Sequence, residues 1–212
     1  MTNIKIRRNK MNMKTIIIIF SVWGIFIILY KWFYSEIYQL FTPFLLIIPA
    51  VLLLVLSVFL GLWSILILIE RVKSDRFVSA LPLLIFIIIT LIDFFTSFDL
   101  LKVRLEYLLY TEKRSEIISE IKNGSLKDDG IGNVELPHGY RQISCDGEAY
   151  ILENDSHGTI VGFWSFRGLL MNPYQMVIYT SYDEPPSCKI LECEKIYQLE
   201  KLGDYWYWVT AY

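Results

Sequence analysis

The chain has 212 residues, of which 54% are hydrophobic, 16% aromatic and 20% charged, and its mean hydropathy is +0.42. An average globular chain is about 45–50% apolar and about 25% charged, so this composition excludes a disordered tail, a fibrous repeat and an ordinary soluble domain. Residues 1–97 carry a net charge of +5 and residues 98–212 a net charge of −7. The acidic second half disfavours nucleic acid as a partner, because phosphate backbones repel it.

Three apolar runs fill the first half of the chain, at residues 15–34, 44–69 and 77–95. Each reaches the length of about 20 residues that a helix needs to cross a hydrocarbon core about 30 Å thick, and Lys31 and Asp93 alone are charged inside them. A cleaved signal peptide is the alternative for the first run, but its length and the sequence after it favour an anchor. We therefore expect a three-helix membrane domain at 15–95 that takes the lipid bilayer as its partner.

The basic residues of the short loops predict the orientation of these spans. Five lysines and arginines lie in residues 1–14 and three in the 70–76 loop, whereas the 35–40 loop has none. Because loops rich in lysine and arginine stay in the cytoplasm, we expect a basic cytoplasmic N-terminus at 1–14. An odd number of spans then places residues 96–212 on the outer side of the cell membrane. Four basic residues soon after the third span argue the other way: Lys102, Arg104, Lys113 and Arg114.

Residues 96–122 predict an amphipathic helix that ends at Asn123-Gly124. Its apolar stripe is expected at Leu101, Leu105, Leu108, Ile117, Ile118 and Ile121, with Arg114 among the polar positions. The sequence does not decide whether this helix continues the third span.

After Gly124 the period of the pattern changes to two, which is typical of strands. Strands are expected at 148–153, 159–166, 176–181, 195–199 and 205–211. The prediction for 96–212 is therefore an extracytoplasmic α+β domain, with one amphipathic helix laid on an antiparallel meander of about five strands.

Three cysteines and two histidines lie in the second half of the chain. Cys188 and Cys193 bracket a short loop and are a candidate disulfide outside the cytoplasm, with two isolated thiols as the alternative. Cys145 and His157 are a conceivable nucleophile pair, although a solvated loop histidine is the more ordinary interpretation. The spacing favours no metal site, and no cofactor is expected.

Two aromatic runs, Phe163-Trp164-x-Phe166 and Tyr205-Trp206-Tyr207-Trp208, are the most unusual feature of the second half. Packing in a core or against lipid headgroups is the ordinary explanation for such rings, and an exposed patch that binds a partner is the other. The candidate partner-binding residues are Trp164, Phe166, Trp206 and Trp208. Alternation along the second run predicts that Trp206 and Trp208 share the more buried face.

No motif in the chain identifies a family or an activity. The pattern favours a non-enzymatic, membrane-anchored protein whose extracytoplasmic domain binds a protein partner, as a sensor, an accessory subunit or an immunity-type factor. One alternative is a surface enzyme that uses Cys145 and His157. The other is a subunit of a transporter complex, which the scarcity of polar residues inside the spans disfavours.

Overall fold

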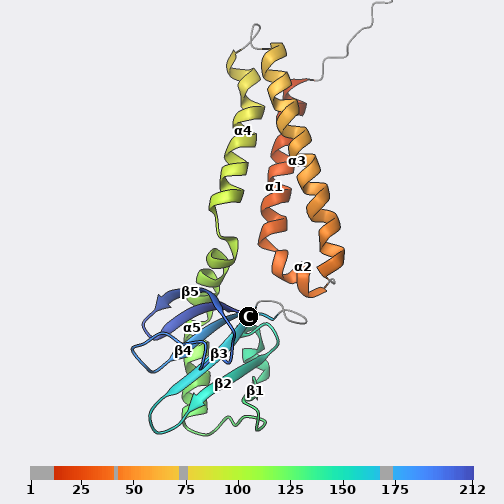
Figure 1. Ribbon diagram of the computed structural model, residues 1–212. Helices are drawn as coiled ribbons and strands as arrows, with labels where there is room; N and C mark the ends of the chain where they lie inside the picture. Colours follow the sequence, from red (N-terminus) through yellow and green to blue (C-terminus); the bar gives the residue numbers. More distant parts are fainter. Residues whose placement is uncertain (1–11, 41–42, 72–75, 168–173) are drawn as a thin grey trace, which may run out of the picture. The chain divides into compact units, whose positions relative to one another are not determined.

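The computed structural model describes residues 12–40, 43–71, 76–167 and 174–212. The chain divides into two compact units, Met1–Ser97 and Phe98–Tyr212. Figure 1 shows that the first unit is built from long helices and the second from a sheet with a helix. The fold is therefore the predicted one in outline: three long apolar helices, then a helix and an antiparallel sheet.

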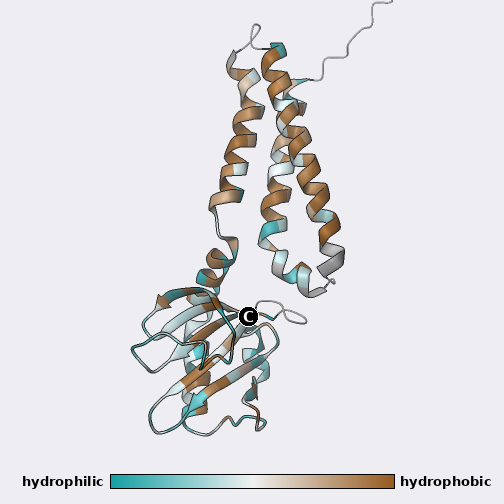
Figure 2. Ribbon diagram, viewed as in Figure 1, coloured by the Kyte–Doolittle hydropathy of each residue, from teal (hydrophilic) through white to brown (hydrophobic). Residues whose placement is uncertain are grey.

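The first unit contains α1 (Met13–Trp32), α2 (Tyr34–Leu40), α3 (Pro43–Arg71) and α4 (Arg76–Phe95). Three segments in it are long and apolar enough to cross a membrane, at Met13–Trp32, Ile47–Arg71 and Phe77–Phe95. Figure 2 shows the same helices as predominantly hydrophobic along their length. These helices confirm the three predicted spans and indicate a multi-pass membrane protein. The 35–40 segment, expected to be a loop, forms the short helix α2.

Close approach of these helices depends on small residues. A Cβ atom at Gly24 of α1 would clash with Ile89 Cδ1 of α4, and one at Gly61 of α3 would meet the Phe86 ring at 2.9 Å. The indole of Trp23 stacks on the same Phe86 ring, with 5.2 Å between the ring centroids. Near the ends of α1 and α4, Lys31 pairs with Asp93 at 3.3 Å. The two charged residues of the predicted spans therefore neutralise each other.

The second unit begins with α5 (Phe98–Lys122), which is separate from α4 because the helix breaks at Thr96 and Ser97. The elements after α5 are β1 (Asn133–Glu135), the 3₁₀ helix η1 (His138–Ile143), β2 (Glu148–Asn154), β3 (Thr159–Phe166), β4 (Tyr174–Thr180), β5 (Ile196–Gly203) and β6 (Trp206–Ala211). The expected strands are all present. Strand β1, which is only three residues long, and η1 were not predicted from the sequence.

The strand order β1-β2-β3-β4-β6-β5 differs from a simple meander. The first four strands follow one another, but β4 pairs with β6 and not with β5. Since every pair is antiparallel, β4 and β5 run in the same direction, and the segment 181–195 must cross from one to the other. We call residues 181–195 the crossover segment. Its Leu191 is buried with Met176 and Tyr207 on one face of the sheet.

The sheet is covered on both faces. On one face α5 packs over a core that includes Phe163, Val177, Trp206 and Trp208. On the other face, residues of the crossover segment cover a second cluster that includes Tyr207. Consecutive side chains of β6 therefore enter different cores, as alternation along a strand requires. Trp206, Tyr207 and Trp208 are 5%, 8% and 1% exposed, so both faces of β6 are buried.

The sheet-facing side of α5 was predicted incorrectly in its first half. Leu101, Leu105 and Leu108 are 44%, 43% and 75% exposed, whereas Val103 is buried and Tyr107 packs against the core. The sheet-facing stripe that continues back from Ile121 passes through the expected polar position Arg114 and not through the leucines. The leucines therefore point away from the sheet.

Arg114 is 1% exposed, although the sequence placed it on the polar side. Its Nε and Nη2 groups donate to the carbonyl of Ile143 at 3.1 and 2.8 Å, and its guanidinium lies 5.6 Å from the centroid of the Phe163 ring. Burial lowers the pKa of this guanidinium to about 10. The side chain therefore joins α5 to the end of η1 from inside the core.

Candidate functional site: an aromatic and arginine cluster on strand β3

Three of the four aromatic residues predicted to bind a partner are buried. Trp206 and Trp208 lie in the core beneath α5, and Phe166 is 9% exposed. The Trp206 ring lies 5.9 Å from the Tyr107 ring and 6.2 Å from the Phe163 ring, centroid to centroid. Packing inside the domain accounts for these residues. Trp164 is the remaining candidate, and it is half-buried.

Trp164 lies on the face of the sheet opposite α5, between two tyrosines. Its ring centroid is 6.3 Å from that of Tyr150 on β2 and 5.3 Å from that of Tyr174 on β4, and the second pair meets edge to face. The guanidinium of Arg167 lies 5.1 Å from the centroid of the Trp164 ring, within the range of a cation–π interaction. We call Tyr150, Trp164, Arg167 and Tyr174 the Trp164 cluster.

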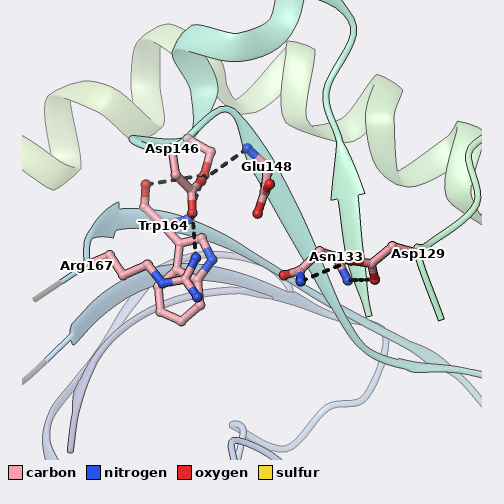
Figure 3. A network of polar contacts seen from close by, with 7 residues as sticks. Asp129, Asn133, Asp146, Glu148, Trp164 and Arg167 are labelled. Carbon is pink, nitrogen blue, oxygen red and sulfur yellow. Dashed lines mark hydrogen bonds and ion pairs between the residues drawn. The ribbon is translucent and has the colours of Figure 1, made fainter. Parts of the chain in front are cut away.

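A polar network holds Arg167 over the ring (Figure 3). Arg167 Nη1 pairs with Asp146 Oδ2 at 3.2 Å. The other carboxylate oxygen of Asp146 accepts from the Ser144 hydroxyl at 3.0 Å and from the Glu148 amide at 3.1 Å. The Arg167 side chain is still 53% exposed. The guanidinium is therefore both oriented and accessible to solvent.

The turn at Ser144–Gly147 positions Trp164. Pairing between β2 and β3 ends at Ala149 and Phe163, and beyond it the Cys145 amide donates to the Trp164 carbonyl at 2.7 Å. The Trp164 amide in turn donates to the Ser144 hydroxyl oxygen at 3.0 Å. Gly147, with a φ of 76°, permits the turn, because this left-handed conformation is strained for other residues. Hydrogen bonds to its carbonyl and from its amide therefore fix the backbone of Trp164.

Two buried polar groups of β3 lack hydrogen-bond partners in the part of the chain that the structure describes. They are the Trp164 indole nitrogen and the Ser165 hydroxyl. Ser165 lies where the register shifts between Trp164 and Phe166. A buried donor without a partner costs about 1–3 kcal/mol, so these groups are unusual features of the cluster.

Cys188 and Cys193, the candidate disulfide, are free thiols five positions apart in the crossover segment. The Cys193 amide donates to the Cys188 carbonyl at 3.1 Å. Burial, followed by interaction with Cys188, raises the pKa of the Cys193 thiol to about 11, while a contact with Tyr174 acts in the opposite direction. The disulfide between them stays a prediction.

Cys145 and His157 lie at opposite ends of β3. Cys145 is bonded to Trp164 through its backbone, whereas His157 lies in the turn just before Thr159, where its amide donates to Asp155. Thr159 and Trp164 are five residue steps apart along the strand, which corresponds to roughly 17 Å. Cys145 and His157 are therefore too far apart in this arrangement to contact each other directly.

Of the residues in and around this cluster, Trp164 was a candidate from the sequence, whereas its neighbours Tyr150, Tyr174, Asp146 and Arg167 were not. Only the register across three strands brings the two tyrosines beside the indole. A usable signal was the basic residue directly after an aromatic strand, but its carboxylate partner comes from a turn more than twenty residues earlier. Within the described residues, no group of three histidine, cysteine or acidic side chains is arranged to hold a metal ion.

The chain matches no protein family model, and comparisons with curated proteins and with solved structures give no match.

Proposed function

We propose that this chain is a non-enzymatic, membrane-anchored protein whose second unit binds a protein partner through the Trp164 cluster. The observation that supports the proposal most is the exposed guanidinium of Arg167, held over the Trp164 ring by Asp146. Tryptophan, tyrosine and arginine are the residues in which binding energy concentrates at protein interfaces. A side chain that is already oriented loses little conformational entropy when a partner binds.

Photo-crosslinking in native membranes tests this proposal. A photoreactive amino acid replaces the exposed Cys145, whose amide bonds Trp164, and in a control protein it replaces Lys127, an exposed residue of the segment after α5. We expect a discrete protein adduct from position 145 and none from position 127. Arg167→Ala should reduce the adduct about 10-fold if the guanidinium is a principal contact.

The control for this experiment is the stability of the second unit. Loss of an exposed ion pair costs about 0–1 kcal/mol, so Arg167→Ala should leave the melting temperature nearly unchanged. An adduct that forms equally from position 127, or one that Arg167→Ala does not weaken, contradicts the proposal. A phenotype abolished by both Cys145→Ser and His157→Ala would instead support the surface-enzyme alternative.

We also propose that the chain lies in the cell membrane with its N-terminus in the cytoplasm and its second unit outside. The distribution of basic residues at 1–14 and 70–76 supports this orientation. Protease added to intact cells should then digest the second unit, and complete protection would contradict the orientation. An oxidising compartment would also favour the Cys188–Cys193 disulfide, detectable as the loss of two hydrogen atoms in the mass of the unreduced protein.

A further inference from the structure

The first half of α5 has apolar side chains on two opposite sides. One side faces the sheet and includes Val103 and Tyr107. The other carries exposed leucines at positions 101, 105 and 108, with intervals of four and three that place them in one row along a helix. Leu109, beside this row, is 70% exposed. We call Leu101, Leu105 and Leu108 the leucine stripe.

The leucine stripe stops abruptly. The same row continues, again at intervals of four and three, with Glu112, Ser115 and Ser119, all of which are exposed. The apolar part therefore covers only the beginning of α5. A helical partner, such as α5 of a second copy, would need an apolar row along most of the helix, since a stable coiled coil extends over three to four heptads.

The leucine stripe lies next to a candidate membrane span in the chain. The third span ends at Phe95 and α5 begins at Phe98. Three residue steps cover at most about 11 Å, so a third span that ends at the bilayer surface would keep the start of α5 close to that surface. The polar headgroup region and the outer edge of the hydrocarbon accept apolar side chains to a depth of about 5–10 Å.

Charged residues flank the leucine stripe as expected for an interfacial helix. Lys102 and Arg104 lie on either side of the row, and Arg104 is exposed. Long basic side chains can place their apolar stems beside lipid tails and their charges at the headgroups. The second half of the row, with its glutamate and serines, has the composition of a surface that faces water.

We propose that the first three turns of α5 lie in the membrane–water interface, with the leucine stripe inserted among lipids. The change from leucine to glutamate and serine marks where the helix leaves the lipid. This surface is separate from the Trp164 cluster, and the proposal does not depend on partner binding there.

Spin labelling of the full-length protein in bilayer discs tests this proposal. In a background with the three native cysteines replaced by serine, a nitroxide is attached after Leu105→Cys or, as the matched control, after Ser119→Cys. The two positions share one row and lie about 21 Å apart along the helix. Collision rates with oxygen, which concentrates in lipid, and with a water-soluble nickel chelate are then compared.

At position 105 we expect the ratio of oxygen to nickel collisions to exceed that at position 119 about 5-fold or more, because lipid excludes the chelate. Equal ratios at the two positions would overturn the proposal. Low collision rates with both reagents at position 105, together with spin–spin broadening, would also overturn it and show that a second copy covers the leucines.

A second measurement avoids the cysteine replacements. A photoreactive amino acid at position 105 of the otherwise native chain should form lipid adducts, and the same amino acid at position 119 should form none. Thermal melting of each variant confirms that the second unit is folded. Lipid adducts at both positions or at neither, in folded protein, contradict the proposal.

Discussion

The two units of this chain use the same large apolar side chains in opposite ways. In the first unit the side chains of Leu52, Leu54 and Ile69 are 64%, 65% and 65% exposed, whereas Val161 and Val177 of the second unit are fully buried. The first arrangement is stable when hydrocarbon surrounds the helices, and the second when water surrounds the domain. The amino-acid composition does not distinguish a lipid-exposed helix from a buried strand, whereas the positions of the polar side chains do. The first turns of α5 expose large apolar side chains, as the helices of the first unit do.

The largest expected effect is on the core beneath α5. Trp208 is 1% exposed, so Trp208→Ala should lower the free energy of unfolding of the second unit by about 3–5 kcal/mol. The matched control is Tyr197→Ala on β5, where the ring is 57% exposed and the expected change is about 0.5 kcal/mol or less. Pulse proteolysis in urea measures both. Equal losses would show that the second unit does not depend on this core.

A smaller effect is expected in the membrane unit. Gly61→Leu forces a side chain against the Phe86 ring of α4 and should destabilise the helix packing by about 1–3 kcal/mol, as overpacking does elsewhere. Ala50→Leu on the same helix is the control, because Ala50 is exposed. Titration with a denaturing detergent should separate the two variants. Neither should change the melting of the second unit, and a change there would contradict the independence of the two units.

Alkaline pH should weaken one contact of the crossover segment. The Tyr182 hydroxyl donates to Glu153 on β2, and this hydrogen bond raises the pKa of Tyr182 from 10.0 to about 12. The folded state holds the proton more tightly than the unfolded state, so the stabilisation is complete below pH 10 and is lost as the pH approaches about 12. The difference in melting temperature between the native chain and Tyr182→Phe should therefore shrink over this range. A constant difference would argue against the hydrogen bond, with Tyr197→Phe as the control for general alkaline effects.

The smallest effect concerns thiol reactivity. In the reduced protein, the Cys193 thiol with its pKa of about 11 should react with iodoacetamide at pH 8 about 10-fold more slowly than a thiol of pKa 9.0. The lower thiolate fraction is partly offset by the higher nucleophilicity of the thiolate. Mass spectrometry of peptides over time measures the rate, and the same peptide in the unfolded chain is the reference. An equal rate in both states would show that burial does not protect this thiol.

The parts of the fold that follow from local patterns could be predicted. The three spans follow from length and lack of charge, and β3 was predicted with its observed limits, Thr159–Phe166. The position of β6 between β4 and β5 could not be predicted, because the pattern of a strand does not specify its neighbours. Arg114 was predicted on the wrong side of the helix because a charged residue usually indicates an exposed position. The local sequence contains no signal for the Ile143 carbonyl that accepts its hydrogen bonds.

The candidate site was only partly predictable for the same reason. Aromatic residues stand out in a sequence, but whether a ring is covered depends on elements distant along the chain. Trp208 is covered by α5, whereas Trp164 meets Tyr150, Tyr174 and Arg167. The alternation along β6 correctly placed Trp206 and Trp208 on one face. It could not reveal that the crossover segment covers the opposite face and buries Tyr207 as well.

The strand order also has a consequence for biosynthesis. Because β6 lies between β4 and β5, the sheet cannot be completed until the ribosome has made residues 206–211 and these have paired with both strands. Strands β4 and β5 are made earlier but gain their shared neighbour last, so their facing edges stay open while translation proceeds. Open strand edges invite pairing with other chains. Nascent copies of this protein are therefore most exposed to misassembly in the interval before β6 emerges, and shortening the chain into β6 should remove an interior strand rather than trim an edge.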